Sequence, residues 1–153
     1  MREKCRIVRQ HNALRSYVAA GLEKRGNPGP QPAALNMKPM VHIVFYNLYK
    51  IIHSSIFNQL RILECTILYS QILGDVTSKP SDIVQMWYDE VNVRGVVRYT
   101  QLIWAATDKL GCGKIVYQAP DDFKHYYLVC NYGPGGNVMT LSLTTTIPPA
   151  SWY

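Results

Sequence analysis

The chain has 153 residues, of which 48% are hydrophobic and 17% are charged, and this balance excludes an intrinsically disordered protein. Its 10 glycines and 9 prolines show no period, which excludes a collagen-like repeat, and its four cysteines suit one or two disulfides rather than a disulfide-dense scaffold. The net charge of +6 would suit an anionic partner, but the densest basic stretch has no interleaved aromatic residues, so nucleic acid is not expected.

The first predicted element is a helix over residues 3–22. Its apolar face recurs at spacings of three and four residues, through Ile7, His11, Leu14 and Val18. Gly21 suits the end of this helix, because glycine readily adopts the left-handed conformation of a C-terminal cap. Residues 26–39 then hold four prolines and two glycines, a density that predicts an extended loop.

Residues 41–73 form a long stretch with no glycine or proline and with three charged residues. Its apolar positions recur at spacings of three and four residues from Val44 to Ile67, which predicts an amphipathic or buried helix. The β-branched content of the stretch also permits a strand. Lys50 lies among polar neighbours near the middle of the most apolar part, so we do not expect a stable membrane span.

The next part of the chain predicts a second helix, a short loop and a segment that is either a helix or a strand. Ser81 and Asp82 are expected to cap a helix of about ten residues that ends near Val91. A short loop over residues 92–98 follows. The apolar run 99–107 fits a helix or a strand by its pattern alone.

The last predicted elements are strands and turns. Residues 111–113 are interpreted as a turn, and alternating apolar residues predict strands at 114–117 and 126–132. The glycine-rich loop 133–137 requires a positive φ or a close approach of its backbone to a neighbour. Helices and strands that do not alternate as βαβ units predict an α+β fold.

Five strings carry a family resemblance in a fixed order, namely HNALR, GLEKRGNPGPQP, WYDE, RYTQLIWAAT and YLVCNYGPGGN. They resemble the CAP superfamily, the secreted group of cysteine-rich secretory proteins, insect venom allergens of the antigen 5 type and plant pathogenesis-related proteins. The arthropod branch is the most similar. The resemblance covers residues 6–40 and 80–138, and it implies a single domain over residues 1–153. The implied fold is a three-layer α-β-α sandwich with a central antiparallel sheet.

The resemblance also implies an extracellular location and a disulfide between Cys112 and Cys130. In the chain-entropy model, closing a loop of this length contributes about 3 kcal/mol of stability. Cys5 and Cys65 match no family motif, and we assign no partner to either.

Members of this family build a cavity from two histidines and two acidic residues that can hold a divalent cation such as zinc or magnesium. Here Glu90 matches one acidic position and Gln71 falls near the other, while Arg98, Tyr99 and Gln101 lie in the string that carries one of the histidines. Arg98 stands where the resemblance implies a histidine, and a guanidinium does not bind a metal. His42 and His53 lack the flanking residues of the second histidine and are interpreted as incidental. We therefore expect no metal, and an ion pair between Glu90 and Arg98 in its place.

Residues 41–73 depart from the family, which has an alanine-rich amphipathic helix at about residues 42–65. Their richness in Ile, Tyr, Phe, Asn and Lys resembles translated AU-rich noncoding sequence. One hypothesis is an irregular gene product, with retained intron sequence in this atypical segment and a skipped stretch before Arg98. The alternative hypothesis is a diverged paralogue that has rebuilt its second helix.

The chain contains no recognisable catalytic constellation, since Ser70 and Ser81 lie outside any glycine-flanked nucleophile turn. We expect a secreted, non-enzymatic protein that binds lipid or sterol, small hydrophobic ligands or host proteins. One alternative is a metal-dependent hydrolase or protease with Glu90 as general base. Another is an intracellular or membrane-associated interaction protein held by residues 41–60, because the start of the chain lacks the apolar core of a secretory signal peptide.

Overall fold

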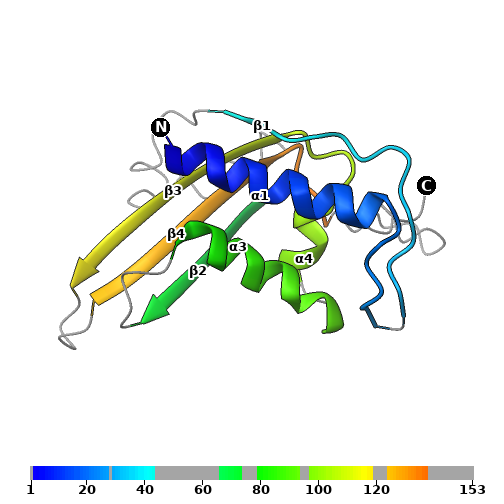
Figure 1. Ribbon diagram of the computed structural model, residues 1–153. Coiled ribbons are helices and arrows are strands. Elements are labelled where there is room, and N and C mark those ends of the chain that lie inside the picture. The colour runs from blue at the N-terminus through cyan, green and yellow to red at the C-terminus, as the bar shows by residue number, and fades with distance from the viewer. Residues whose placement is uncertain are drawn as a thin grey trace.

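The structure is a computed structural model, and it describes residues 2–27, 29–43, 66–73, 79–93, 97–118 and 124–137 of the chain. The described helices are α1 (Arg2–Ala19), α3 (Pro80–Asp89), the short 3-10 helix η3 (Glu90–Asn92) and α4 (Val97–Leu102). The described strands are β1 (Val41–His42), β2 (Thr66–Leu73), β3 (Lys109–Gln118) and β4 (Lys124–Gly133). Figure 1 shows α1 crossing the strands, with α3 and α4 beside it.

The strands form a four-stranded sheet in the order β1-β3-β4-β2. Strand β4 pairs antiparallel with both of its neighbours, β3 and β2. The short edge strand β1 runs parallel to β3, so the sheet is mixed rather than wholly antiparallel as the resemblance implied. The α+β class is confirmed. The second helix of the family falls at about residues 42–65, and residues 44–65 lie outside the described part of the chain.

The hydrophobic core lies between the sheet and helices α1 and α3. Successive side chains of a strand point to opposite faces, so alternate residues of β4 share the face that meets the helices. Those residues are fully or almost fully buried, and they join one core cluster with side chains of α1 and α3, including Ile7, Val18, Ile83, Trp87, Leu128, Cys130 and Tyr132.

One prediction about a strand was wrong. Residues 111–113 are not a turn but lie within β3, where Gly111 and Gly113 are paired with Asn131 and Val129 of β4. Residues 66–73 form β2, which pairs with β4 along its whole length, so the strand that the β-branched content permitted is present in this part. At both places β4 supplies hydrogen-bond partners to the backbone of its neighbouring strand, which the local pattern does not report.

The two later helices were predicted more closely. The run at residues 99–107 begins as helix α4, which starts at Val97 inside the predicted loop. Helix α3 starts at Pro80, and its N-cap is Lys79 rather than Ser81 or Asp82. Asp82 takes the third helical position instead, where its carboxylate accepts the backbone N–H of Lys79 at 3.0 Å. Proline suits the first helical position because the N–H it lacks would have no partner inside the helix.

Arg15, on α1, is a buried cation that binds main-chain carbonyl groups. Its guanidinium donates to the carbonyl oxygens of Leu102, Trp104 and Thr107 at 3.0, 2.8 and 3.0 Å. It also donates twice to the carbonyl oxygen of Lys38, at 3.2 and 2.6 Å. Burial lowers the pKa of Arg15 to about 10, so the side chain stays charged at neutral pH. One side chain therefore joins α1 to the proline-rich loop and to the end of α4.

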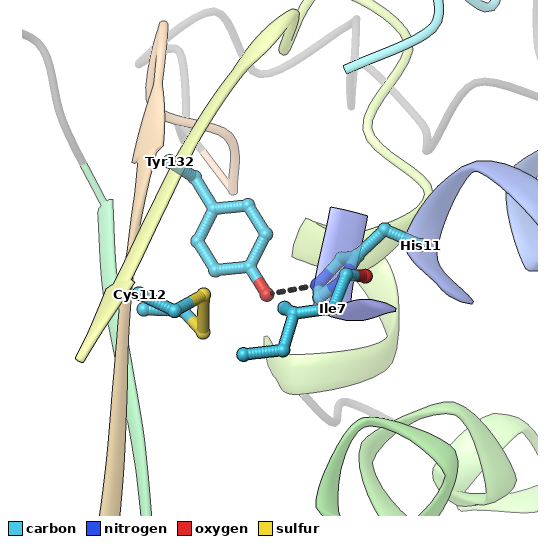
Figure 2. Close-up of a disulfide and its surroundings, with 5 residues drawn as sticks. Ile7, His11, Cys112 and Tyr132 are labelled. Atoms are coloured by element: carbon cyan, nitrogen blue, oxygen red, sulfur yellow. Dashed lines mark hydrogen bonds between the residues drawn. A yellow bond between two sulfur atoms is a disulfide. The ribbon is translucent and has the colours of Figure 1, made fainter. Parts of the chain in front are cut away.

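His11, also on α1, forms a second buried polar contact, with β4. A carbonyl oxygen can only accept, so Nδ1 carries the proton and donates to the Ile7 carbonyl at 2.8 Å. The Tyr132 hydroxyl then donates to Nε2 at 2.7 Å. Figure 2 shows this hydroxyl directed at His11, with the tyrosine ring beside the disulfide. Burial, with a smaller contribution from Arg15, lowers the pKa of His11 to about 4.

The variant Arg15→Leu tests the carbonyl contacts. It would remove the Arg15 hydrogen bonds from four carbonyl groups, of which Trp104 keeps the backbone N–H of Thr107 at 3.2 Å, and we expect it to lower the free energy of unfolding by about 3–5 kcal/mol. Arg9→Leu is the matched control, because Arg9 is exposed on the same helix. Guanidinium chloride unfolding of both variants measures the difference. Equal midpoints for the two would contradict the structural role of Arg15.

The titration of His11 predicts acid sensitivity. The pKa is about 4 in the folded chain against an ordinary value of 6.5, so the unfolded chain takes up the proton first as the pH falls. The stability that neutral His11 supports is complete above about pH 6.5 and is lost progressively towards about pH 4, by about 3 kcal/mol in total. Urea unfolding across this window should show a steeper loss for the wild type than for His11→Gln, and parallel profiles would exclude His11 as the cause.

Candidate functional site

The candidate site lies at the corner between α3 and α4. Glu90 follows the last residue of α3 and begins η3, while Arg98 is the second residue of α4. The Arg98 Nε lies 3.1 Å from the Glu90 Oε1, so the structure contains the ion pair that the sequence suggested. Trp87 and Tyr88, directly before this corner, are buried in the core and fix the end of α3.

The ion pair is half-buried, with 21% of the Glu90 side chain and 40% of the Arg98 side chain exposed. Burial raises the pKa of Glu90, and the nearby charge of Arg98 partly opposes that rise. The second carboxylate oxygen, Oε2, is buried and has no hydrogen-bond partner within the described residues. Burial therefore favours the neutral form of Glu90, and Arg98 favours the charged form.

Exposed apolar side chains flank the ion pair along the chain. Met86 lies one helical turn before Glu90, on the same side of α3. Val93 and Val97 stand on either side of the segment that joins η3 to α4, and all three side chains are more than half exposed. The corner thus combines a polar centre with apolar neighbours.

Two other positions that the resemblance assigns to the cavity, Tyr99 and Gln101, make contacts away from the Glu90–Arg98 ion pair. Tyr99 is buried, with its ring centroid 5.4 Å from that of Tyr88, and burial raises its pKa. Gln101 is also buried, and its amide donates to the Thr107 hydroxyl at 3.1 Å while its oxygen accepts the N–H of Gly136 at 2.7 Å. Gln101 thus links Thr107, before β3, to the loop that follows β4.

Gln71, the remaining position, lies in β2 opposite Tyr127 of β4. Its side chain lies outside what the structure describes. The structure therefore brings together Glu90 and Arg98 and leaves the place of Gln71 in a cavity as a prediction.

The loop 133–137 meets the expectation for its backbone. Asn137 has a φ of 56°, in the left-handed region. A Cβ added at Gly136 would lie 2.6 Å from the Trp104 ring, so only glycine fits there without a shift of the indole. The loop therefore has both a positive φ and a close approach of its backbone to a neighbour, which the sequence analysis gave as alternatives.

A second charged cluster next to the corner was not found from the sequence. Glu23 is buried and accepts the Tyr88 hydroxyl at 2.6 Å. Arg25 donates to both of its carboxylate oxygens, at 3.0 and 2.8 Å, and also to Asp89 at 2.8 Å. The hydrogen bonds from Arg25 are the main cause that lowers the pKa of Glu23 to about 2. The strings GLEKR and WYDE both resemble the family, but neither string predicts that its side chains contact those of the other.

The described residues do not fit a divalent metal. They contain no group of three or more His, Cys, Asp or Glu side chains that could hold one. His42 is exposed on the edge strand β1, and His53 lies outside the described part of the chain. The group nearest the Glu90 carboxylate is a guanidinium, which offers donors only.

A disulfide joins Cys112 and Cys130, which face each other on β3 and β4 with their Cα atoms 4.1 Å apart. Its sulfur atoms lie against the core beside Tyr132 (Figure 2). Cys5 is an exposed free thiol on α1. Cys65 lies outside the described residues.

This sheet, its helical cover and its disulfide define a CAP-domain protein. The model of the cysteine-rich secretory protein family, CAP, matches residues 53–132, and the chain belongs to this family. Venom allergen 5 of Vespa velutina is 39% identical, over 89% of this chain and 76% of the relative. Venom allergen 3 of Solenopsis invicta is 36% identical, over 90% and 69%. The resemblance to antigen 5 proteins is thereby confirmed.

Solved structures give the same fold. The crystal structure of NaASP2 with Zn2+ superposes with a TM-score of 0.66 at 28% identity, covering 90% of this chain and 82% of that one. BmVAL-1 gives a TM-score of 0.69 at 22% identity, covering 90% and 79%. Within the described residues no helix is both long enough and apolar enough to cross a membrane.

Replacing both bridged cysteines, Cys112→Ser with Cys130→Ser, tests the disulfide. The loop it closes spans 18 residues, and its loss should lower the free energy of unfolding by about 3 kcal/mol. Cys5→Ser is the control, and it should leave the unfolding midpoint unchanged because Cys5 is exposed and free. A double variant as stable as the wild type would show that the bridge does not constrain the chain.

Proposed function

We propose that the chain is a secreted, non-enzymatic CAP-domain protein of the venom allergen 5 type. It acts by binding lipid or sterol, other small hydrophobic ligands or host proteins. The observation that supports the non-enzymatic part of this proposal is the ion pair between Glu90 and Arg98. The charge of Arg98 opposes the rise in the Glu90 pKa that burial causes, and it therefore weakens the carboxylate as a general base.

The same pair argues against the alternative of a metal-dependent hydrolase. Such an enzyme uses a bound cation to activate water, and the group beside Glu90 is a permanent cation with no lone pair for a metal. The exposed Met86, Val93 and Val97 instead favour contact with an apolar partner.

An extracellular location is supported by the family, which is named for secretion, and by the disulfide. Disulfides persist mainly in oxidising compartments. A bridge between two central strands, with one cysteine fully buried, suits a protein that leaves the cell.

The function is tested with material secreted from insect cells behind an added leader. We expect mass mapping to find the Cys112–Cys130 bridge. A fluorescent fatty acid or sterol probe should bind saturably, while ester and peptide substrates should remain uncleaved with zinc or magnesium. Substituting Met86 and Val97 by serine should weaken probe binding by about tenfold, since each buried methylene contributes close to 1 kcal/mol.

The hydrolase alternative is tested in the same experiment by Glu90→Gln, with Asp108→Asn as its control. Asp108 pairs with Lys109 at the surface, away from the Glu90 ion pair. Cation-dependent cleavage that disappears in Glu90→Gln and survives in Asp108→Asn would replace the binding proposal with an enzymatic one.

A further inference from the structure

We propose that Arg98 is a built-in cation, which makes the α3–α4 corner of this protein independent of a divalent metal. The guanidinium occupies the place beside Glu90 that the family resemblance gives to a metal-binding histidine. The charge balance of the Glu90–Arg98 pair is then the same whichever ligand the protein binds.

The geometry supports the substitution of one cation for another. Arg98 extends from the first turn of α4 and Glu90 from the end of α3, so the pair closes the corner between two helices. A divalent ion bound by groups from both elements would serve the same purpose. Among the described residues Glu90 has no second cation beside it, so Arg98 supplies that charge.

Burial distinguishes this pair from ordinary surface pairs. Exposed ion pairs contribute little, because solvent screens the charges and the side chains lose freedom. Glu90 is mostly buried, and its Oε2 has no partner within the described residues. A half-buried carboxylate that loses its counter-charge becomes destabilising, which is why the site requires a cation of some kind.

The arginine also excludes a metal by two separate effects. A guanidinium remains protonated at all physiological pH values, so it never becomes a ligand. Its positive charge, 3.1 Å from the carboxylate, repels any further cation that approaches the same oxygen atoms. The other carboxylates nearby, of Glu23 and Asp89, are already paired with Arg25.

The first test titrates zinc chloride and then magnesium chloride into the disulfide-bonded full chain and into Glu90→Gln, by calorimetry after chelation. The two proteins have the same histidines, so zinc bound by histidines away from this corner contributes equally to both titrations. We expect equal stoichiometry and an equal shift of the melting temperature in the two. One additional zinc or magnesium ion in the wild type that is absent from Glu90→Gln would overturn the proposal.

The second test is a double-mutant cycle of Arg98→Gln and Glu90→Gln, measured by melting temperature. Arg98→Gln should lower it by about 2–4 °C, because the carboxylate loses its cation, and the double variant should recover part of that loss. The Asp108–Lys109 pair is the control, with side chains 33% and 52% exposed, and its cycle should be additive within about 1 °C. Additive effects at Glu90 and Arg98 would show that the two charges are not coupled and would overturn the proposal.

Discussion

The buried guanidinium of Arg15 is the contact on which the arrangement of the other elements depends. The last carbonyl groups of a helix have no partner inside it, and Leu102, the last residue of α4, is fully buried. Arg15 donates to the Leu102 carbonyl, and to those of Trp104, Thr107 and Lys38 in the adjoining segments. A positive charge is favourable at the negative end of a helix. The Arg15 side chain therefore supplies hydrogen-bond donors at the end of α4 and fixes α1 against that helix.

The charged cluster of Glu23, Arg25, Tyr88 and Asp89 fixes α3 in a comparable way. Glu23 and Arg25 follow α1 along the chain, while Tyr88 and Asp89 end α3, and the Arg25 guanidinium also stacks over the Tyr88 ring with 5.3 Å to its centroid. Helix α1 and the loop after it thus determine the position of both helices that carry the site. The Glu90–Arg98 pair forms where these two helices meet, with 3.1 Å between the Arg98 Nε and the Glu90 Oε1.

Sequence patterns predicted α1, α3 and the core of both long strands, because apolar periodicity reports which face each element buries. They were wrong at residues 111–113 and left helix and strand open at residues 66–73, and in both places pairing with β4 decides the structure. At the site, the WYDE and RYTQ strings identified Glu90 and Arg98 as neighbours. The role of Arg15 could not be predicted, because its partners are main-chain carbonyl groups, which have no sequence pattern.

Placing arginine where a family histidine is implied changes how the corner responds to its surroundings. A histidine changes charge near neutral pH and binds metals only in its neutral form, so a histidine site depends on both pH and metal supply. The guanidinium keeps its charge throughout this range. Arg98 opposes the rise in the pKa of Glu90 that burial causes. In the proposed arrangement the corner has a fixed charge where the resemblance implies a variable ligand, and a fixed charge suits a constant binding surface more than a catalytic centre.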